Sequence, residues 1–228
     1  MEPHTLSPTQ WIVQTKLQLP RLRDDLVARP RLLAALHKAV RTHRLTLVSA
    51  PAGYGKTTLL AALPRAYPQL SMVWLTLDEE ENDPVIFMSA FVAALQRLDP
   101  AYGVSVQSQL ADPSRATLNL RWVAGLLIND ILATQPAPFV VVLDDLHRIS
   151  NPAIHDALDY LLEHLPPSMH LAVTTRHDPP LSLACLRARG QLAEFRLPSL
   201  SFRLEETSTL LFVQFLLDLP LSALRALQ

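Results

Sequence analysis

One short stretch holds four residues with the types and spacing of a phosphate-binding loop. In "APAGYGKTT", residues 50–58, Gly53 and Gly55 are followed directly by Lys56 and Thr57. Glycine permits a tight turn and removes the side chains that would keep a phosphate away from backbone N–H groups. The lysine places a cation on the β- and γ-phosphates, and the threonine hydroxyl is suited to ligate Mg²⁺. The stretch therefore predicts a site for a nucleoside phosphate with Mg²⁺.

The same stretch departs from the pattern G-x-x-x-x-G-K-[ST] at its first glycine, where Ala50 stands. Ala50 closes an apolar run, and an extended strand end tolerates a β-carbon, so we expect the loop to keep its function. A plain turn between a strand and a helix, with an exposed lysine, is the structural alternative. If the loop binds phosphates, the residues around them are Ala52, Gly53, Tyr54, Gly55, Lys56, Thr57 and Thr58.

Two carboxylates follow a second apolar run, "FVVVLDD", at residues 139–145. In open α/β sheets, ligands bind at the carboxyl ends of the strands, which is where Asp144 and Asp145 would lie. A nucleotide-hydrolysing site needs one carboxylate in the magnesium shell and a group that orients the attacking water. We expect Asp144 to take the first role and Asp145 the second. A pair of acids that merely begins a loop is the alternative.

Other polar residues near predicted strand ends are weaker candidates. Arg176 ends the run "LAVTTR" and is placed to reach a γ-phosphate, although a solvated loop arginine has the same pattern. His147 follows the acidic pair, and a lone histidine of this kind is more often structural than catalytic. Asp78 and the acids at 79–81 follow another strand, and we expect a solvated acidic loop there.

Apolar periodicity and turn signals supply the elements that would position these residues. They predict strands at 44–50, 71–77, 139–145, 170–176 and 192–197, and helices at 31–43, 56–63, 83–98, 117–134, 151–164, 205–217 and 221–227. Residues 99–114 are predicted as a loop. The helix at 117–134 offers four core candidates, Leu118, Trp122, Leu126 and Ile131. Strands that alternate with helices indicate a parallel sheet with helices on both faces.

Composition limits the classes of protein that fit. The 228 residues are 49% hydrophobic with a formal net charge of −1, which suits one good-sized domain and perhaps the start of a second. Because basic and acidic residues nearly balance, the chain has no overall positive field that would attract nucleic acid. The single cysteine excludes an internal disulfide, no apolar run is long enough to span a bilayer, and no signal-peptide pattern begins the chain. We expect a cytoplasmic protein.

Several segments in one order resemble a known family. They are "TKLQLPRLRDDLVARPRLLAAL", "VSAPAGYGKTTLL", "VWLTLDEEENDPVIFMSAFVAAL", "FVVVLDDLHRISNPAIHDALDYLLEHLP", "LAVTTRHDPPLSLACLRARGQL" and "LSFRLEET". Together they resemble the MalT-type transcriptional activators, large ATP-binding regulators of the LuxR family within the STAND class of P-loop ATPases. The resemblance covers residues 15–228, and alanine is ordinary in that family at the position of Ala50.

This resemblance implies a fold and a layout. The fold is an α/β P-loop NTPase three-layer sandwich with a mainly parallel five-stranded sheet of order 5-1-4-3-2. Residues 1–43 would contribute to the adenine pocket, 44–200 would form the nucleotide-binding domain, and 201–228 would begin a helical domain. Carried over by position, Val27 and Arg29 would lie near the adenine base, Lys56 and Thr57 at the phosphates and Mg²⁺, Asp144 and Asp145 at the acidic motif, and Arg176 at the sensor position.

The resemblance also implies a function, a slow ATPase used as a switch. ADP would hold a closed monomer, while ATP and a small-molecule or protein inducer would favour self-association and activation of transcription. DNA contact would come through a C-terminal domain that we expect beyond this chain, and no membrane partner is expected. Two alternatives stay open: a STAND-class scaffold coupled to an effector that does not bind DNA, and a housekeeping P-loop enzyme.

Overall fold

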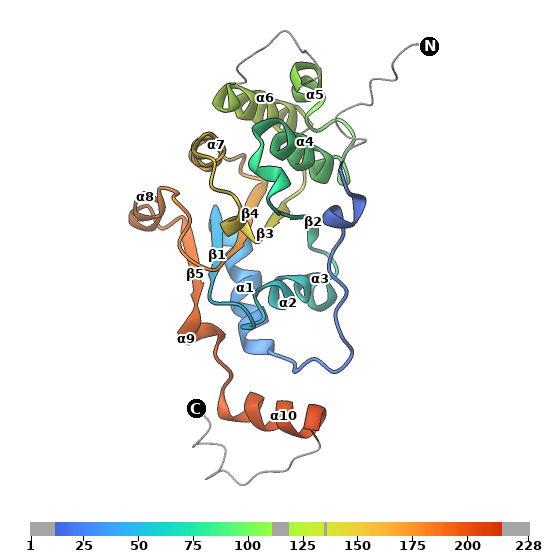
Figure 1. Cartoon of the computed structure of the whole chain (residues 1–228), viewed down its shortest axis with the longest axis vertical. Helices are drawn as coiled ribbons and strands as arrows, with labels where there is room; N and C mark the ends of the chain where they lie inside the picture. Colours follow the sequence, from blue (N-terminus) through green and yellow to red (C-terminus); the bar gives the residue numbers. More distant parts are fainter. Residues whose placement is uncertain (1–11, 111–118, 135, 216–228) are drawn as a thin grey trace.

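A five-stranded sheet forms the centre of the molecule in the computed structural model, which describes residues 12–110, 119–134 and 136–215 (Figure 1). The strands are β1 (Leu45–Ser49), β2 (Ser71–Thr76), β3 (Phe139–Asp144), β4 (Met169–Thr175) and β5 (Leu192–Arg196). All neighbouring strands pair in parallel, in the order β2-β3-β4-β1-β5. This is the predicted order 5-1-4-3-2 read from the opposite edge, so the fold prediction is confirmed.

Successive residues of each strand belong to two separate hydrophobic cores. In β3, Val141 and Leu143 lie in one core, while Val140 and Val142 lie in the other. Side chains alternate between the two faces of a strand, so each core covers one face of the sheet. Because both faces are covered, an unbroken apolar run such as "FVVVL" is fully buried and needs no polar alternation.

Helices cover both faces and make the three-layer sandwich (Figure 1). The core of one face includes residues of α4 (Pro84–Leu95), α5 (Val104–Leu110), α6 (Leu120–Ala133), α7 (Pro152–Glu163) and α8 (Leu183–Ala188). The core of the other face includes residues of α1 (Pro30–Thr42), α2 (Lys56–Ala61), α3 (Leu63–Ala66) and α9 (Leu197–Leu200). The last described helix, α10 (Leu204–Phe215), follows α9 and lies below the α2 side of the sandwich in Figure 1.

The helices predicted at 83–98 and 151–164 each begin at an Asx-Pro pair. The Asp83 carboxylate accepts hydrogen bonds from the N–H groups of Val85 and Ile86 at the start of α4. The Asn151 side chain accepts one from the N–H of Ala153 at the start of α7. Each cap satisfies donors that have no partner inside the helix, and the proline that follows lacks the N–H that would need one.

The predicted loop at 99–114 is wrong, because α5 lies within it. Its first turn is held by Asp130 of α6, whose carboxylate accepts from the backbone N–H of Ser105 at 2.9 Å and from the Ser105 hydroxyl at 2.7 Å. Val106 of the same helix is fully buried. The capping carboxylate lies 25 residues further along the chain. The local sequence therefore contains no capping signal from which this helix could be predicted.

Smaller differences concern boundaries and short elements. The helix predicted at 56–63 ends at Ala61, and Pro64 lies in the first turn of α3, where its missing N–H costs nothing. Trp122, a predicted core residue, is 43% exposed. The short helices α8 and α9 were not predicted. Leu118 and the helix expected at 221–227 lie outside the described residues.

The segment before α1 is fixed to the sheet edge by Lys16, which lies in a 3-10 turn, Gln14–Leu17. Its ammonium lies 2.7 Å from the carboxylate of Asp78, 2.8 Å from Glu81 and 3.1 Å from Glu80. Burial opposes the charge of Lys16, but hydrogen bonds to the three carboxylates raise its pKa above the usual range. The expectation of a solvated acidic loop is therefore wrong for Glu81, which is buried, while Asp78 stays half-exposed and Glu80 exposed, although both pair with Lys16.

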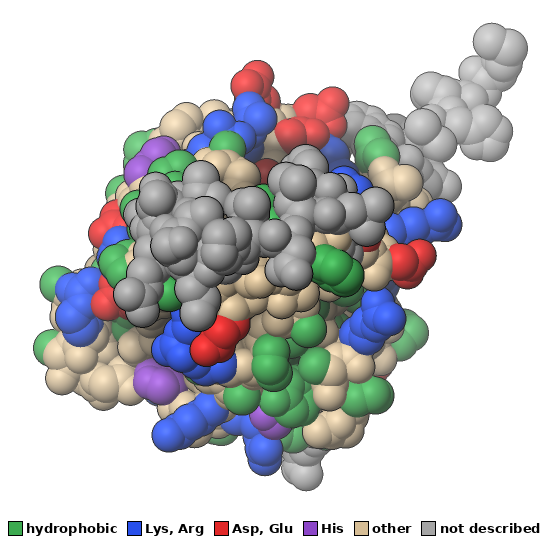
Figure 2. All heavy atoms as spheres, turned by 90° about the horizontal axis from the view of Figure 1, so that it is seen from below, with side chains coloured by type: hydrophobic (Ala, Val, Ile, Leu, Met, Phe, Trp, Pro, Cys, Tyr) green, Lys and Arg blue, Asp and Glu red, His purple; other side chains and the backbone are tan. Residues whose placement is uncertain are grey.

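The surface seen from the α10 end carries basic, acidic and hydrophobic side chains interspersed (Figure 2). This mixture agrees with the formal net charge of −1. Within the described ranges, no helix has both the length and the apolar character that crossing a membrane requires.

Candidate nucleotide-binding site

The loop between β1 and α2 has the backbone that a phosphate cradle requires. Gly53 and Gly55 have φ angles of +87° and +70°, in the left-handed region that only glycine adopts without strain. A β-carbon added at either glycine would meet no atom within 4 Å. The glycines are therefore needed for backbone conformation, and the space in front of them is open to a ligand.

Ala50 explains why the first glycine of the pattern is dispensable. Its N–H donates to the carbonyl of Thr175 at 3.3 Å, which continues the pairing of β1 with β4 by one residue. Its side chain is 3% exposed and packs in the core on the α1 and α2 side of the sheet. A β-carbon at this position adds packing and does not reach the glycine turn.

Lys56 is the first residue of α2, and its side chain folds back over the loop. The ammonium donates to the carbonyl of Pro51 at 3.0 Å, and the residue is 6% exposed. Burial lowers the pKa of Lys56, and the charge of Arg176 lowers it further, while Asp145 and Asp144 act in the opposite direction. A buried cation beside an open glycine turn is an arrangement that an anionic ligand stabilises.

A hydrogen-bonded group joins the phosphate loop to the ends of β3 and β4. The hydroxyl of Thr57 donates to both carboxylate oxygens of Asp144, at 2.9 and 3.2 Å. The fully buried Thr174 donates to Oδ1 of Asp144 at 2.6 Å. Burial raises the pKa of Asp144, and the two hydroxyls counteract this by stabilising the carboxylate. Threonine and aspartate oxygens are ligands that suit Mg²⁺, so this group fits the predicted metal role.

Asp145 has an unusual backbone conformation. Its φ of 63° makes it the one non-glycine residue with positive φ among those the structure describes. The strain is held by a hydrogen bond of 2.8 Å from the Asp145 N–H to the Thr174 hydroxyl. Aspartate tolerates this region better than most residues, and such conformations gather at functional sites. The turn directs the chain away from the sheet directly after Asp144.

Arg176 lies exposed directly after β4. Its charge acts on Lys56 and on His147, lowering the pKa of each. The structure therefore brings Lys56, Asp144, Asp145 and Arg176 to one edge of the sheet. These residues were predicted from the ends of three different strands.

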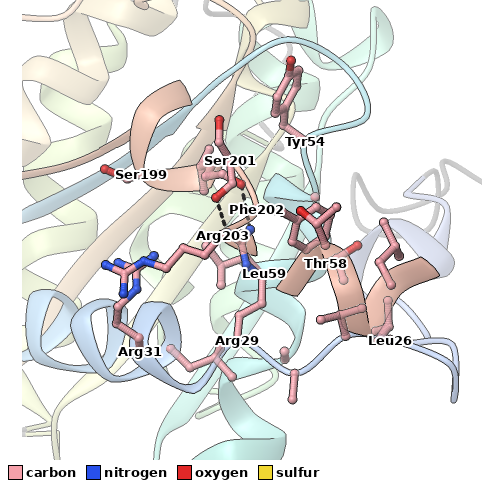
Figure 3. A pocket seen from close by; sticks show the side chains of 18 of the residues that line it. Leu26, Arg29, Arg31, Tyr54, Thr58, Leu59, Ser199, Ser201, Phe202 and Arg203 are labelled. Atoms are coloured by element: carbon pink, nitrogen blue, oxygen red, sulfur yellow. Dashed lines mark hydrogen bonds between the residues drawn. The ribbon is translucent and has the colours of Figure 1, made fainter. Parts of the chain in front are cut away.

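A large cavity of about 1570 Å³ lies beside the phosphate loop (Figure 3). Its walls come from the loop, from the segment before α1 and from the chain between β5 and α10. Of the predicted binding residues, Val27, Arg29, Gly53, Tyr54, Gly55 and Thr58 line it. Ala52, Lys56, Thr57 and the acidic pair do not line it; Lys56 and Thr57 begin α2, and the two acids lie where β3 ends. The predicted site thus divides into a polar phosphate end and a wider cavity.

Arg29 builds a wall of this cavity, and its guanidinium is already engaged. It donates to the carbonyls of Leu200 and Ser201 at 2.8 and 2.9 Å, pairs with Glu206 at 3.1 Å, and lies 4.7 Å from the ring centroid of Phe202. Figure 3 shows the side chain reaching toward the Ser201–Phe202 segment. Sequence reasoning missed these partners, and the contact of Arg29 with an adenine base stays a prediction.

The fold and the site define a P-loop nucleotide-binding domain, and comparison with known proteins specifies the family. The model of the AAA ATPase domain family matches residues 23–174, and the chain belongs to this family. A Walker-type ATPase of Pyrococcus abyssi has a similar fold, with a TM-score of 0.51 and 16% identity over 90% of this chain and 63% of that one. Membership of this family implies nucleotide binding, and the role of the loop that carries Lys56 stays a prediction.

Among curated proteins, the chain is similar to HTH-type transcriptional regulators named MalT. The regulator of Cronobacter sakazakii is 37% identical over 195 residues, which is 86% of this chain and 21% of the relative. The regulator of Yersinia enterocolitica is 36% identical over 210 residues, which is 92% of this chain and 22% of the relative. The chain thus spans about a fifth of the length of these relatives.

Proposed function

We propose that this chain is the ATP- and ADP-binding switch module of a MalT-type transcriptional regulator, with slow ATP hydrolysis resetting the switch. The observation that carries the proposal is the hydrogen bond from Thr57 to Asp144, which joins the phosphate loop to the acidic strand end. The similarity to MalT regulators supports the regulatory context.

Each residue of the site has a defined task in this proposal. The N–H groups of the glycine loop and the start of α2 bind phosphate oxygens, and Lys56 exchanges the Pro51 carbonyl for a phosphate. Thr57 and Asp144 would hold Mg²⁺, which when bound neutralises charge on the phosphates. Asp145 orients and activates the attacking water, and Arg176 reaches the γ-phosphate and so distinguishes ATP from ADP.

The wider cavity supports a role for the base and ribose end of the nucleotide. It is lined on one side by the segment before α1 and on the other by the start of α10. We propose that residues around Val27 and Arg29 contact the adenine. A nucleotide there would contact two segments outside the sheet. A change from ATP to ADP would therefore alter the contacts of the chain that follows β5.

Self-association in the ATP state, response to an inducer and control of transcription are the finer parts of the proposal. In this scheme, DNA contact belongs to a part of the regulator outside these residues. A STAND-class scaffold with a different effector is the alternative. Sedimentation velocity with ATP and with ADP tests self-association, and equal sedimentation coefficients in the two nucleotides would remove it from the proposal.

Nucleotide titration calorimetry tests the binding site directly. Lys56→Ala should abolish tight binding of ATP and ADP, because a buried cation that faces the phosphate space is lost. Lys38→Ala is the matched control, since Lys38 is exposed on α1. Undiminished affinity in Lys56→Ala would refute the phosphate cradle, and a parallel loss in Lys38→Ala would show that the effect is not specific to the loop.

A further inference from the structure

His147 carries a buried imidazole that the proposed function does not yet use. Its side chain is 8% exposed, and neither ring nitrogen has a hydrogen-bond partner among the described residues. Buried polar groups are nearly always hydrogen-bonded, because one that has lost its water and gained no partner destabilises the fold. A ring with two such atoms at the edge of a binding site calls for a functional explanation.

A carboxylate oxygen of the proposed water-activating residue lies close to this ring. Nδ1 of His147 lies 3.7 Å from Oδ1 of Asp145, just beyond hydrogen-bond distance. The ring of His177 meets that of His147 edge-on at a centroid distance of 6.1 Å. Burial lowers the pKa of His147, the Asp145 charge opposes this, and the charges of Arg176, Arg148 and His177 lower it further. A neutral imidazole carries one N–H donor and one acceptor nitrogen.

The short 3-10 turn Leu146–Arg148, which carries His147, is fixed at both ends. At its start, the N–H of Asp145 is bonded to Thr174. After it, the side-chain oxygen of Asn82 accepts from the N–H groups of Ser150 and Asn151 at 2.8 and 2.9 Å. Leu146 itself is fully buried in the core. The ring of His147 is therefore held beside Asp145 by the fold, and its place does not depend on a flexible loop.

We propose that His147 is a positioning residue for Asp145, and that its Nδ1–H donates to the carboxylate in the nucleotide-bound state. The inference rests on the proposed function, because it assumes that Asp145 orients the attacking water. Hydrogen bonds at catalytic groups are often long without ligand and tighten when the ligand binds. No proton transfer by His147 is required, only a fixed orientation of the carboxylate.

Separate measurement of turnover and affinity tests this role. His147→Ala should lower kcat for ATP hydrolysis by about 10- to 100-fold, the range expected when a catalytic group loses its orientation, and should change ADP affinity less than about twofold. His147→Asn should restore most of the rate, because its amide nitrogen replaces Nδ1, whereas His147→Gln, which replaces Nε2, should not. His177→Ala is the control for loss of a neighbouring imidazole and should retain the rate.

A second measurement needs no turnover. Nitrogen NMR of the ring in the presence of Mg²⁺ and a non-hydrolysable ATP analogue reports which nitrogen bears the proton. We expect the Nδ1–H form, with a shift of that signal in Asp145→Asn. The proposal would be overturned if the proton lies on Nε2 and the ring signals are the same in Asp145→Asn. It would also be overturned if His147→Ala hydrolyses ATP at the wild-type rate. Failure of the proposed function is seen separately, as unchanged ADP affinity in Lys56→Ala.

Discussion

Replacement of Thr174 by valine isolates the hydroxyl that holds the site together. Thr174 is fully buried, so valine fills nearly the same space without gaining or losing exposed surface. The hydroxyl makes two hydrogen bonds, one donated to Oδ1 of Asp144 at 2.6 Å and one accepted from the N–H of Asp145 at 2.8 Å. The variant removes both, and it leaves the carboxylate with Thr57 as its remaining hydroxyl donor among the described residues.

The expected cost follows from these two bonds. A hydrogen bond to a charged acceptor contributes about 1.5–3 kcal/mol, and an N–H left without an acceptor costs about 1–3 kcal/mol. The two terms are not additive, because they share one hydroxyl and because small movements of the surrounding groups reduce the loss. We therefore expect the free energy of unfolding to fall by about 3 kcal/mol. With a urea m-value of about 3 kcal/mol/M, the midpoint should move by about 1 M. Urea unfolding followed by circular dichroism measures it.

Thr46→Val provides the matched control. Thr46 is also fully buried in the sheet, but its hydroxyl bonds the neutral ring of His170, at 3.0 Å from Nε2. We expect it to cost about 1 kcal/mol, the usual value for a neutral pair. A cost for Thr174→Val no larger than that of Thr46→Val would refute the reasoning, because the bridge between Asp144 and Asp145 would then contribute nothing special.

Three further predictions concern the loop, the N-terminal segment and acid stability. Gly55→Ala should lose about 1–2 kcal/mol of stability to left-handed strain and at least tenfold in ADP affinity by calorimetry, whereas Gly190→Ala, with φ of +65° and equally open space, should lose stability alone. Lys16→Met should cost about 2 kcal/mol by leaving three carboxylates without their cation, and Lys38→Met almost nothing; equal urea midpoints would contradict this. Burial lowers the pKa of His170 to about 4, so the unfolded chain binds a proton between pH 6.5 and 4 that the folded chain does not, and unfolding free energy should fall by about 3 kcal/mol over that range. His170→Gln should reduce the dependence of the unfolding free energy on pH between 6.5 and 4. An unchanged dependence would show that groups other than His170 cause the loss of stability in acid.

The strand order and the loop could be predicted because their signals are local. Gly53, Gly55 and Lys56 stand within four consecutive positions, between an apolar run and a helical one. The two acids follow directly after another apolar run. Parallel strands bring such endings to one edge of the sheet, so placing Asp144 near Thr57 needed only the correct topology, which the structure confirms.

Residues whose roles depend on distant partners could not be predicted in the same way. Asp130 caps α5 across 25 residues, and nothing in the run 104–110 indicates the cap. The sequence presents His147 as a lone histidine after an acidic pair. Its burial and its approach to Asp145 depend on Leu146 packing in the core and on Asn82 holding the following residues, contacts that join segments more than sixty positions apart.

The position of the segments that line the large cavity follows from the order of the strands, and no single sequence motif predicts it. β5 pairs with β1, the strand that leads into the phosphate loop, so the chain that leaves β5 emerges beside that loop. The segment before α1 approaches from the other side, and Arg29 bonds the two across 171 and 172 positions. The cavity is therefore lined both by chain that precedes the sheet and by chain that follows it. Any change of ligand that moves Arg29 would act directly on the start of α10, because the guanidinium pairs with Glu206 in its first turn.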